Sequence, residues 1–168
     1  GYVQFDIYSS DTVKPKMLPA LRRNVGIIFQ DFKLLEDRTV YENLAFILEI
    51  TGAKRRDIKR KVYQVLSEVG LAHKQKNKIH QLSGGEQQRI AIARAIINEP
   101  KLIIADEPTG NLDPETSNEI LDILTKISAR GTSVLFATHN YELVKKYKSR
   151  IIRLKDGRAE SVDDLSKL

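Results

Sequence analysis

The stretch from Leu82 to Asp113 constrains this chain most strongly, and it reads LSGGEQQRIAIARAIINEPKLIIADEPTGNLD. It combines three features in a fixed order. A Ser-Gly-Gly turn stands at the start of a predicted helix, an apolar run ends in two adjacent carboxylates, and a tight turn is followed by a third acid, Asp113. Each feature is suited to binding phosphate or the metal ion that accompanies phosphate.

The first feature is the tetrapeptide Ser83-Gly84-Gly85-Glu86. A serine followed three positions later by glutamate is a capping box, which predicts that a helix begins here. The start of a helix exposes unpaired N–H groups and the positive end of the helix dipole. Because glycine is a poor helix former, two glycines after the cap indicate close access of an anion to the backbone. The alternative is an ordinary capped helix with glycines in its first turn.

The second feature is the run LIIADE at residues 102–107. Pro100 ends the preceding helix, and the isoleucine-rich run predicts a strand buried on both faces, as in parallel sheets. Ligands of open α/β sheets bind beyond the carboxyl ends of the strands, which is where Asp106 and Glu107 stand. One carboxylate is suited to Mg²⁺ and the other to orienting or deprotonating a water. The alternative is a strand that simply ends in an acidic turn.

Together these segments resemble the ATP-binding cassette (ABC) ATPase family. LSGGEQQ resembles the family's signature motif, LIIADE its Walker B strand with the catalytic glutamate, and GNLD at residues 110–113 its D-loop. The resemblance implies an α/β fold, a P-loop NTPase-like ABC ATPase domain with an inserted helical subdomain. It implies a single domain over residues 1–168, with a RecA-like core in residues 1–30 and 99–168 and the helical subdomain in residues 31–98.

Two further polar residues follow predicted strands. Residues 24–30 (NVGIIFQ) are predicted to form a buried strand ending in Gln30, and residues 133–138 (SVLFAT) another, followed by His139. By the resemblance, Gln30 matches the Q-loop glutamine that reaches Mg²⁺ and the attacking water, and His139 the switch histidine that senses the γ-phosphate. Without the resemblance, Gln30 is a residue at which a sheet ends, and a lone histidine is more often structural or exposed than catalytic.

Helices are predicted for much of the remaining chain. Thr39 and Glu42 form another capping box, and residues 54–69 place their apolar side chains on one face of a helix. Asp113 followed by proline is a typical helix N-cap. The resemblance places residues 31–43 in the groove where the family's membrane partner docks. The candidate contacts are Phe32, Leu34 and Leu35, which are equally well explained as anchors of a loop on the core.

Composition restricts the partners. Lys and Arg number 28 against 22 Asp and Glu, a net charge of +6 that is compatible with anionic substrates or a membrane surface. The basic runs lack a nucleic-acid motif, so a solvated helix face is their usual explanation and no nucleic-acid partner is expected. The absence of cysteine excludes disulfides and thiolate metal sites. No apolar run approaches the roughly 20 residues of a membrane span.

The phosphate-binding loop of the family, GxxxxGK[ST], does not occur in the sequence, which has no Gly-Lys dipeptide. By the resemblance, the family's N-terminal strands and P-loop are missing and would precede Gly1. The strands predicted near residues 24–30, 102–106, 133–138 and 150–154 are then expected to leave a gap with unpaired edges. We therefore expect a fragment that binds nucleotide weakly or not at all and is inactive by itself.

The resemblance implies an ATP-binding and ATP-hydrolysing subunit of an ABC-type membrane complex at the cytoplasmic face of the bacterial inner membrane. FQDFKLLEDRTVYENLAF and DEPTGNLDPETSNEI resemble the branch of the family that acts in bacterial cell division with an integral membrane partner. DEPTGNLD is shared with the ATPases of lipoprotein release and macrolide export. These transporters, or a cytosolic nucleic-acid-associated ABC ATPase, are the alternatives.

By the same resemblance, two copies of the protein sandwich two ATP molecules with their Mg²⁺ ions. The nucleotide held by one copy then meets the signature residues of the other copy, and most of the catalysis is positioning and charge neutralisation. The expected site residues are Glu107, His139 and Gln30 as catalytic groups, Ser83, Gly84, Gly85 and Asp113 as nucleotide contacts, and Asp106 and Gln30 as ligands of Mg²⁺.

Overall fold

The computed structural model describes residues 1–147 and 149–162, which divide into two compact units, one of residues Gly1–Phe136 and one that begins at Ala137. Within the described residues, no helix combines the length and the apolar character needed to cross a membrane. The elements, in chain order, are β1 (Gln4–Phe5), β2 (Tyr8–Ser9), η1 (Pro15–Met17), α1 (Leu18–Arg23), β3 (Val25–Ile28), α2 (Val40–Ile50), α3 (Arg55–Glu68), η2 (Ala72–Lys74), η3 (Ile79–Gln81), α4 (Gly84–Ile96), β4 (Leu102–Asp106), α5 (Pro114–Ala129), β5 (Ser133–Ala137), α6 (Tyr141–Lys146), β6 (Ile151–Lys155) and β7 (Arg158–Val162).

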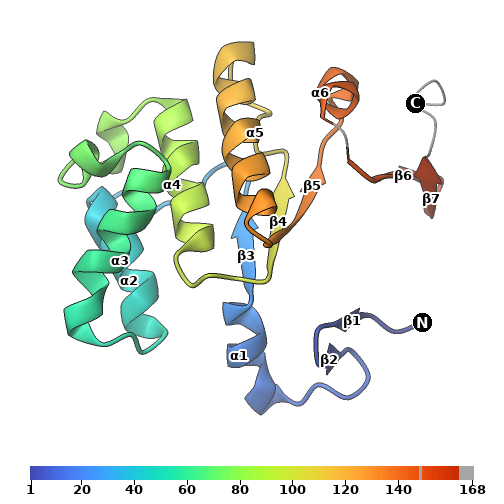
Figure 1. Cartoon of the computed structure of the whole chain (residues 1–168), viewed down its shortest axis with the longest axis horizontal. Helices are drawn as coiled ribbons and strands as arrows, with labels where there is room; N and C mark the ends of the chain where they lie inside the picture. Colours follow the sequence, from blue (N-terminus) through green and yellow to red (C-terminus); the bar gives the residue numbers. More distant parts are fainter. Residues whose placement is uncertain (148, 163–168) are drawn as a thin grey trace. The chain divides into compact units, whose positions relative to one another are not determined.

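A three-stranded sheet with the order β3-β4-β5 lies at the centre of the first unit (Figure 1). β3 and β4 are parallel, and their register pairs Val25 with Leu102 and Ile28 with Ala105. Parallel strands require a crossover connection, which helices α2, α3 and α4 provide between β3 and β4. The carboxyl ends of β3 and β4 therefore meet at one edge of the sheet.

Only one face of β3 and β4 is buried. Ile28 and Ile103 are fully buried, whereas Ile27 and Ile104 on the opposite face are 45% and 36% exposed. The prediction that β4 is buried on both faces is therefore wrong. The predicted buried strand β3 is buried on one face only, and the prediction of burial is wrong for β5, whose Leu135 is 53% exposed. The composition of an apolar run does not reveal which of its faces another element covers.

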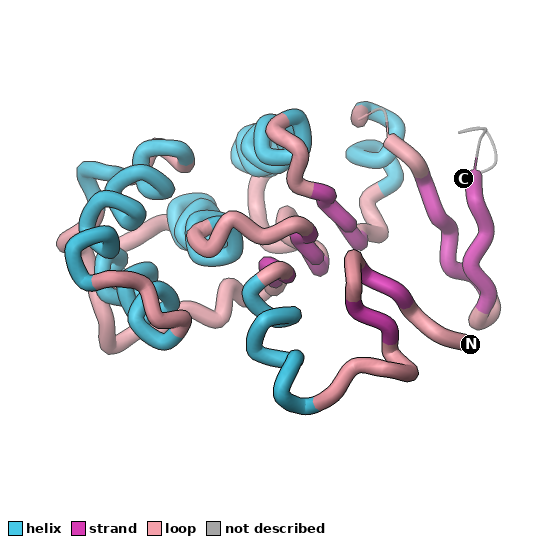
Figure 2. The backbone as a smooth tube through the Cα atoms, turned by 60° about the horizontal axis from the view of Figure 1, so that its bottom comes forward, coloured by secondary structure: helices cyan, strands magenta, loops and turns pink. Residues whose placement is uncertain are grey.

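Helix α4 covers the buried face of β3 at very short range. A Cβ added to Gly26 would lie 2.5 Å from the backbone oxygen of Ala95, so only glycine allows this approach. Residues 90–93 of α4 are fully buried, and α4 packs against α2, α3 and α5 as well as β3 (Figure 2). The helix that carries the LSGGEQQ sequence is thus the central helix of the first unit.

The helices predicted in residues 39–69 are confirmed. Thr39 caps α2 through a reciprocal pair of hydrogen bonds, because its N–H donates to Glu42 Oε2 at 2.7 Å and its Oγ1 accepts from the Glu42 N–H at 3.2 Å. The buried side of α3 consists of Ile58, Val62, Val65 and Leu66. It stays a prediction that residues 31–98 form a helical subdomain and that the rest form a RecA-like core. Residues 148 and 163–168 lie outside the described residues.

The second unit contains a hairpin that the sequence predicted only in part. β6 pairs antiparallel with β7, and Lys155 stands opposite Arg158 across the turn Asp156-Gly157. Both turn residues have positive φ, as a tight hairpin turn requires. The strand predicted near residues 150–154 therefore exists, but its partner in the described residues is β7 and it does not join the sheet β3-β4-β5.

Replacing Gly26 with alanine tests the close approach of α4 to β3. The new Cβ would collide with a backbone atom, which can move only if the helix and the strand separate. We expect Gly26→Ala to lower the free energy of unfolding by about 3 kcal/mol. Urea or thermal unfolding measures this loss.

The control is Ile27→Ala, which shortens the neighbouring side chain on the exposed face and should cost less than about 1 kcal/mol. Equal losses for the two variants would show that the contact between Gly26 and Ala95 is not tight.

Candidate functional site

The predicted residues Gln30, Asp106 and Glu107 come together at one edge of the sheet. Asp106 is the last residue of β4, and Glu107 follows it directly. The parallel register ends with Ile28 opposite Ala105, so Gln30 leaves β3 at the edge where Asp106 leaves β4. Asp106 and Gln30 are exposed and Glu107 is half-buried. The edge therefore presents two carboxyl groups and an amide to solvent.

The side chain of Gln30 lies against the turn that follows β4. A Cβ added to Gly110 would stand 3.2 Å from Gln30 Nε2 and 3.4 Å from the backbone oxygen of Glu107. The N–H of Gly110 donates to that same oxygen at 3.0 Å, which closes the turn. Glu107 itself has φ +43, a conformation that non-glycine residues seldom adopt and that often occurs at functional sites.

The donor set at this edge fits a magnesium ion. Mg²⁺ prefers oxygen ligands, and in nucleotide sites it usually combines one or two carboxylates with waters and phosphate oxygens. Asp106 offers a carboxylate and Gln30 an amide oxygen, both exposed at the same edge. No cluster of three or more His, Cys, Asp or Glu side chains suited to a metal occurs in residues 1–147 and 149–162.

The predicted capping box at the start of α4 is confirmed. Ser83 Oγ accepts from the Glu86 N–H at 3.2 Å, and Glu86 Oε2 accepts from the Ser83 N–H at 2.9 Å. This second hydrogen bond lowers the pKa of the Glu86 carboxyl, and Lys74 at 3.2 Å lowers it further. Ser83 and Gly84 are exposed, so a partner in solution could reach this helix tip.

The tip of α4 packs on the segment that follows β4. A Cβ added to Gly85 would lie 2.4 Å from Thr116 Cγ2, and one added to Gly84 would lie 3.5 Å from Leu112 Cδ2. Leu112 belongs to the turn before α5, and Thr116 to the first turn of α5. The LSGG and GNLD sequences, which lie some 30 residues apart in the chain, are therefore direct neighbours, and Gly85 has a packing role besides the predicted anion contact.

Asp113 caps α5, as the sequence predicted. Its carboxylate accepts from the Thr116 N–H at 2.9 Å. Hydrogen bonds from Thr116, first from its side chain and then from its backbone, lower the pKa of Asp113. In this chain the Asp113 carboxylate therefore has a local structural partner, and its predicted part in coupling two nucleotide sites stays a prediction.

Gln88 is a residue of this region that the sequence analysis missed. It is fully buried, and its Nε2 donates to the backbone oxygen of Pro108 at 2.6 Å. Its Oε1 is buried without a hydrogen-bond partner among the described residues. Gln88 thus connects α4 to the turn after Glu107. The signal in the sequence was its place on the face of α4 that also carries the buried Ile92 and Ala95.

His139 belongs to the second unit, whereas Glu107 belongs to the first. It follows β5, as predicted, and precedes a short helix, α6, whose N-cap is Asn140. The Asn140 side chain accepts from the N–H groups of Glu142 and Leu143 at 3.1 and 3.3 Å. The predicted contact of His139 with a γ-phosphate stays a prediction.

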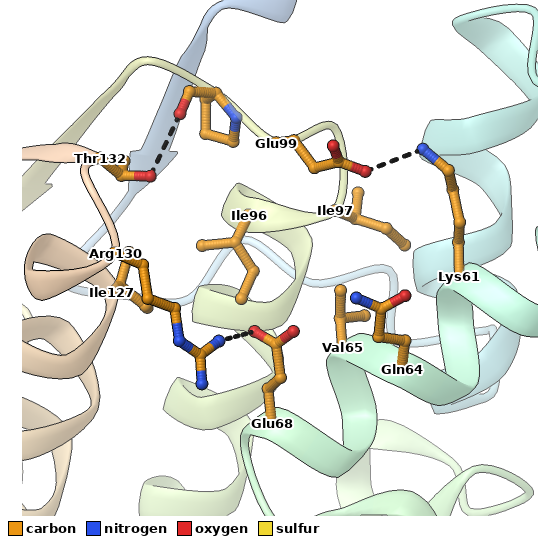
Figure 3. Close-up of a pocket in the computed structure, with 11 residues that line it drawn as sticks. Lys61, Gln64, Val65, Glu68, Ile96, Ile97, Glu99, Ile127, Arg130 and Thr132 are labelled. Carbon is orange, nitrogen blue, oxygen red and sulfur yellow. Dashed lines mark hydrogen bonds and ion pairs between the residues drawn. The ribbon is translucent and has the colours of Figure 1, made fainter.

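A cavity of about 190 Å³ lies at the opposite end of the sheet, where Pro100 and Thr132 precede β4 and β5 (Figure 3). Ion pairs between Lys61 and Glu99 and between Arg130 and Glu68, both at 3.1 Å, cross its rim. Isoleucine and valine side chains of α3, α4 and α5 also line it. None of the predicted site residues lines this cavity, and the polar edge with Asp106 is the candidate site.

Comparison with known proteins places this geometry in a family. The model of the ABC transporter family matches residues 1–110, about two thirds of the chain. The chain belongs to the ABC transporter family. Its α/β architecture is accordingly the P-loop NTPase-like fold of the ABC ATPase domain.

Curated relatives include proteins named cell division ATP-binding protein FtsE. The chain is 56% identical to the one from Streptococcus pneumoniae (strain D39 / NCTC 7466) over 146 residues, which is 87% of this chain and 64% of that protein. It is 53% identical to the Bacillus subtilis (strain 168) protein over the same shares of both chains. It is 47% identical to the Escherichia coli K12 protein, over 94% of this chain and 71% of the relative. The chain thus spans about 64% of the length of the first two relatives.

Solved structures of this family have the same fold. One is a dimeric post-hydrolysis state of the ATP-binding cassette MJ0796 bound to ADP and Pi, with a TM-score of 0.80, 34% identity, and coverage of 96% of this chain and 73% of that one. Another is cbiO1 from Clostridium perfringens, part of the ABC transporter complex cbiONQ, with a TM-score of 0.80, 32% identity, and coverage of 88% and 59%.

The two signature glycines provide a matched pair of variants. Alanine at position 85 would press on Thr116, whose β-branched side chain has little rotamer freedom in a helix, whereas alanine at position 84 would make an ordinary contact with Leu112. We expect Gly85→Ala to lower the free energy of unfolding by about 2 kcal/mol and Gly84→Ala to change it by less than about 0.5 kcal/mol. Chemical unfolding of both variants measures these two changes in the free energy of unfolding. A larger loss for Gly84→Ala would contradict the packing described above.

The lowered pKa of Asp113 predicts a pH-dependent contribution to stability. Because the folded-state pKa lies below that of the unfolded chain, about 3.9, the ionised cap stabilises the fold above that value and is lost as the pH falls through the folded-state pKa. We expect Asp113→Asn to lower Tm at pH 7 and this difference to vanish in acid. Thermal unfolding over a pH series measures it, and a Tm difference that stays constant with pH would contradict a charged cap.

Proposed function

We propose that this chain supplies the signature, Walker B and D-loop parts of an ATP-hydrolysing subunit of an ABC-type complex. The observation that carries the proposal is the parallel register of β3 and β4, which brings Gln30, Asp106 and Glu107 to one edge of the sheet. The contact of Gln30 with the turn at Gly110 supports it. Carboxylates and an amide at the carboxyl ends of parallel strands are the groups that nucleotide sites use.

In the proposed mechanism the edge residues act on metal and water. Asp106 would bind Mg²⁺, and Gln30 would supply a second oxygen ligand. Glu107 accepts a proton from the attacking water, for which its half-buried position at the end of β4 is suited. When bound, Mg²⁺ neutralises charge on the phosphates of ATP. His139 is the proposed contact for the γ-phosphate.

The helix tip acts on the nucleotide of a second copy. Ser83, Gly84 and Gly85 carry a hydroxyl and the N–H groups of the first helical turn, at the positive end of α4. These groups bind a phosphate held by a second copy, so the functional unit is a homodimer. Asp113 lies in the turn that packs on the tip, and this position suits it to coupling the two sites of the dimer.

The finer biological proposal rests on the relatives. Identity of 47–56% to proteins named for cell division supports a role in bacterial cell division. We propose an FtsX-like integral membrane partner and a peripheral position on the cytoplasmic face of the inner membrane. Phe32, Leu34 and Leu35, in the loop between β3 and α2, are the proposed contacts with that partner.

The chain has no Gly-Lys dipeptide, so hydrolysis requires a phosphate-binding loop from another segment. The 168 residues alone should therefore bind Mg·ATP weakly or not at all. In protein that joins these residues to such a loop, we expect Glu107→Gln to lower ATP hydrolysis at least about 100-fold and to leave a stable ATP-bound dimer. Phosphate release and size-exclusion chromatography with ATP measure the two effects.

The matched control is Glu99→Gln, which removes a glutamate at the opposite end of the sheet and should keep both hydrolysis and the normal dimer equilibrium. Undiminished turnover in the Glu107 variant would remove that residue from the proposed role. Tight Mg·ATP binding by the 168 residues alone would contradict the requirement for a separate loop.

A further inference from the structure

The loop after β3 has an unusual backbone. Phe32 and Lys33 are consecutive residues with φ +59 and +50, in the left-handed region that non-glycine residues seldom adopt. Two backbone hydrogen bonds between residues close in the chain accompany this conformation. The Phe32 N–H donates to Phe29 O at 3.3 Å, and the Lys33 N–H donates to Asp31 O at 2.6 Å. Residues in such conformations persist only where the surroundings hold them, so the loop requires an anchor.

Arg94 of helix α4 is that anchor. Its Nη2 donates to the backbone oxygen of Phe32 at 2.7 Å, and its Nη1 donates to the backbone oxygen of Lys33. The planar guanidinium group suits two neighbouring carbonyls in a way that a single ammonium group does not. Arg94 is half-buried, and burial lowers the pKa of its guanidinium, which indicates that carbonyl contacts replace part of its hydration.

The anchor sits where α4 cannot move independently of the strand. Ala95, the next residue of α4, is in backbone contact with Gly26 of β3. The loop is thus fixed to the same short section of helix that is fixed to the strand. Gln30 lies between these two points of attachment, two residues after β3 and two residues before Phe32.

A second anchor holds the other end of the loop. The buried Asn43 of α2 accepts from the Leu35 N–H at 2.8 Å and donates to the Leu35 backbone oxygen at 3.0 Å. This anchor acts five residues beyond Gln30, with the left-handed turn in between. The section next to Gln30 therefore depends on Arg94, and the section near Leu35 depends on Asn43.

We propose that Arg94 is a positioning residue for Gln30, because by holding the carbonyls of Phe32 and Lys33 it keeps the Gln30 amide against the turn at Gly110. It also fixes the loop to the helix that begins at Ser83, so a displacement of the helix tip reaches Gln30 through one rigid helix. That consequence rests on the function proposed above, whereas the positioning itself is a property of this chain alone.

The test uses the ¹⁵N-labelled 168-residue chain without nucleotide, so its outcome is independent of the Glu107 experiment. Lysine at position 94 keeps the positive charge and loses the fork of two donors. We expect Arg94→Lys to speed amide hydrogen exchange at Phe32 and Lys33 at least about tenfold, and to change the exchange rate at Leu35 less than about threefold. The resonances of the Gln30 side-chain amide and of the Gly110 N–H should also shift.

The matched control is Arg89→Lys, on the same helix, where Arg89 pairs with Glu119 of α5 at 2.6 Å. It should leave the Gln30 and Gly110 resonances unchanged. Exchange that rises uniformly along α4 in the Arg94 variant would indicate general destabilisation and overturn the proposal. Unshifted Gln30 resonances beside faster exchange at Phe32 would overturn it as well.

A second variant approaches the same contact from the loop and leaves α4 intact. Lys33→Pro cannot adopt φ +50, so the Lys33 carbonyl has to leave Arg94. Lys33 is exposed and lies in a loop outside the core, so this variant keeps the test available if the Arg94 variant fails to fold. We expect the same shifts at Gln30 and Gly110. Wild-type resonances there in folded Lys33→Pro protein would overturn the proposal.

Discussion

The backbone contact between Gly26 and Ala95 is the constraint on which the first unit depends. It brings α4 against β3 without intervening side chains, and β3 in turn fixes β4 through their parallel register. One helix and two strands therefore form a rigid group. This group carries both the tip of α4 at Ser83 and the polar ends of the strands at Asp106. The position of the helix tip relative to the strand ends therefore follows from the packing of the group.

Local signals in the sequence predicted most of the helices and the strand ends. The capping boxes at Thr39 and Ser83 and the cap at Asp113 depend on residues three positions apart, so the sequence contains the whole interaction. Burial of the strands was predicted wrongly, because Ile27 and Ile104 have the composition of core residues but lie on the face of the sheet that α4 does not cover. The pairing of β6 with β7 was missed for a related reason, since Arg158–Val162 is mostly polar and exposed.

The sequence likewise predicted some residues of the candidate site and not others. Gln30, Asp106 and Glu107 were predictable because each follows an apolar run, and parallel strands bring such positions together. The residues that hold the site were not predictable. Arg94 reaches a carbonyl 62 positions earlier in the chain, and Gln88 one 20 positions later. Helical periodicity places Gln88 on the buried face of α4 but does not reveal which group either side chain contacts, because these contacts form only when α4 has docked.

Packing explains one of the two glycines in the signature sequence. Gly85 lies against Thr116, where a side chain has no room, whereas Gly84 is exposed at the helix tip. Gly85 therefore has a structural reason to be glycine, whereas packing gives none for Gly84, and the anion contact of both residues stays a prediction.

The proposed ligand of the polar edge of the sheet is a metal–nucleotide complex. Paramagnetic broadening by Mn·ATP tests it most directly, in ¹⁵N-labelled protein that also carries a phosphate-binding loop. We expect the resonances of Asp106 and of the Gln30 side-chain amide to be lost first as Mn·ATP is added. Sharp resonances at these two residues, with broadening instead around Pro100 and Thr132 at the opposite end of the sheet, would contradict it.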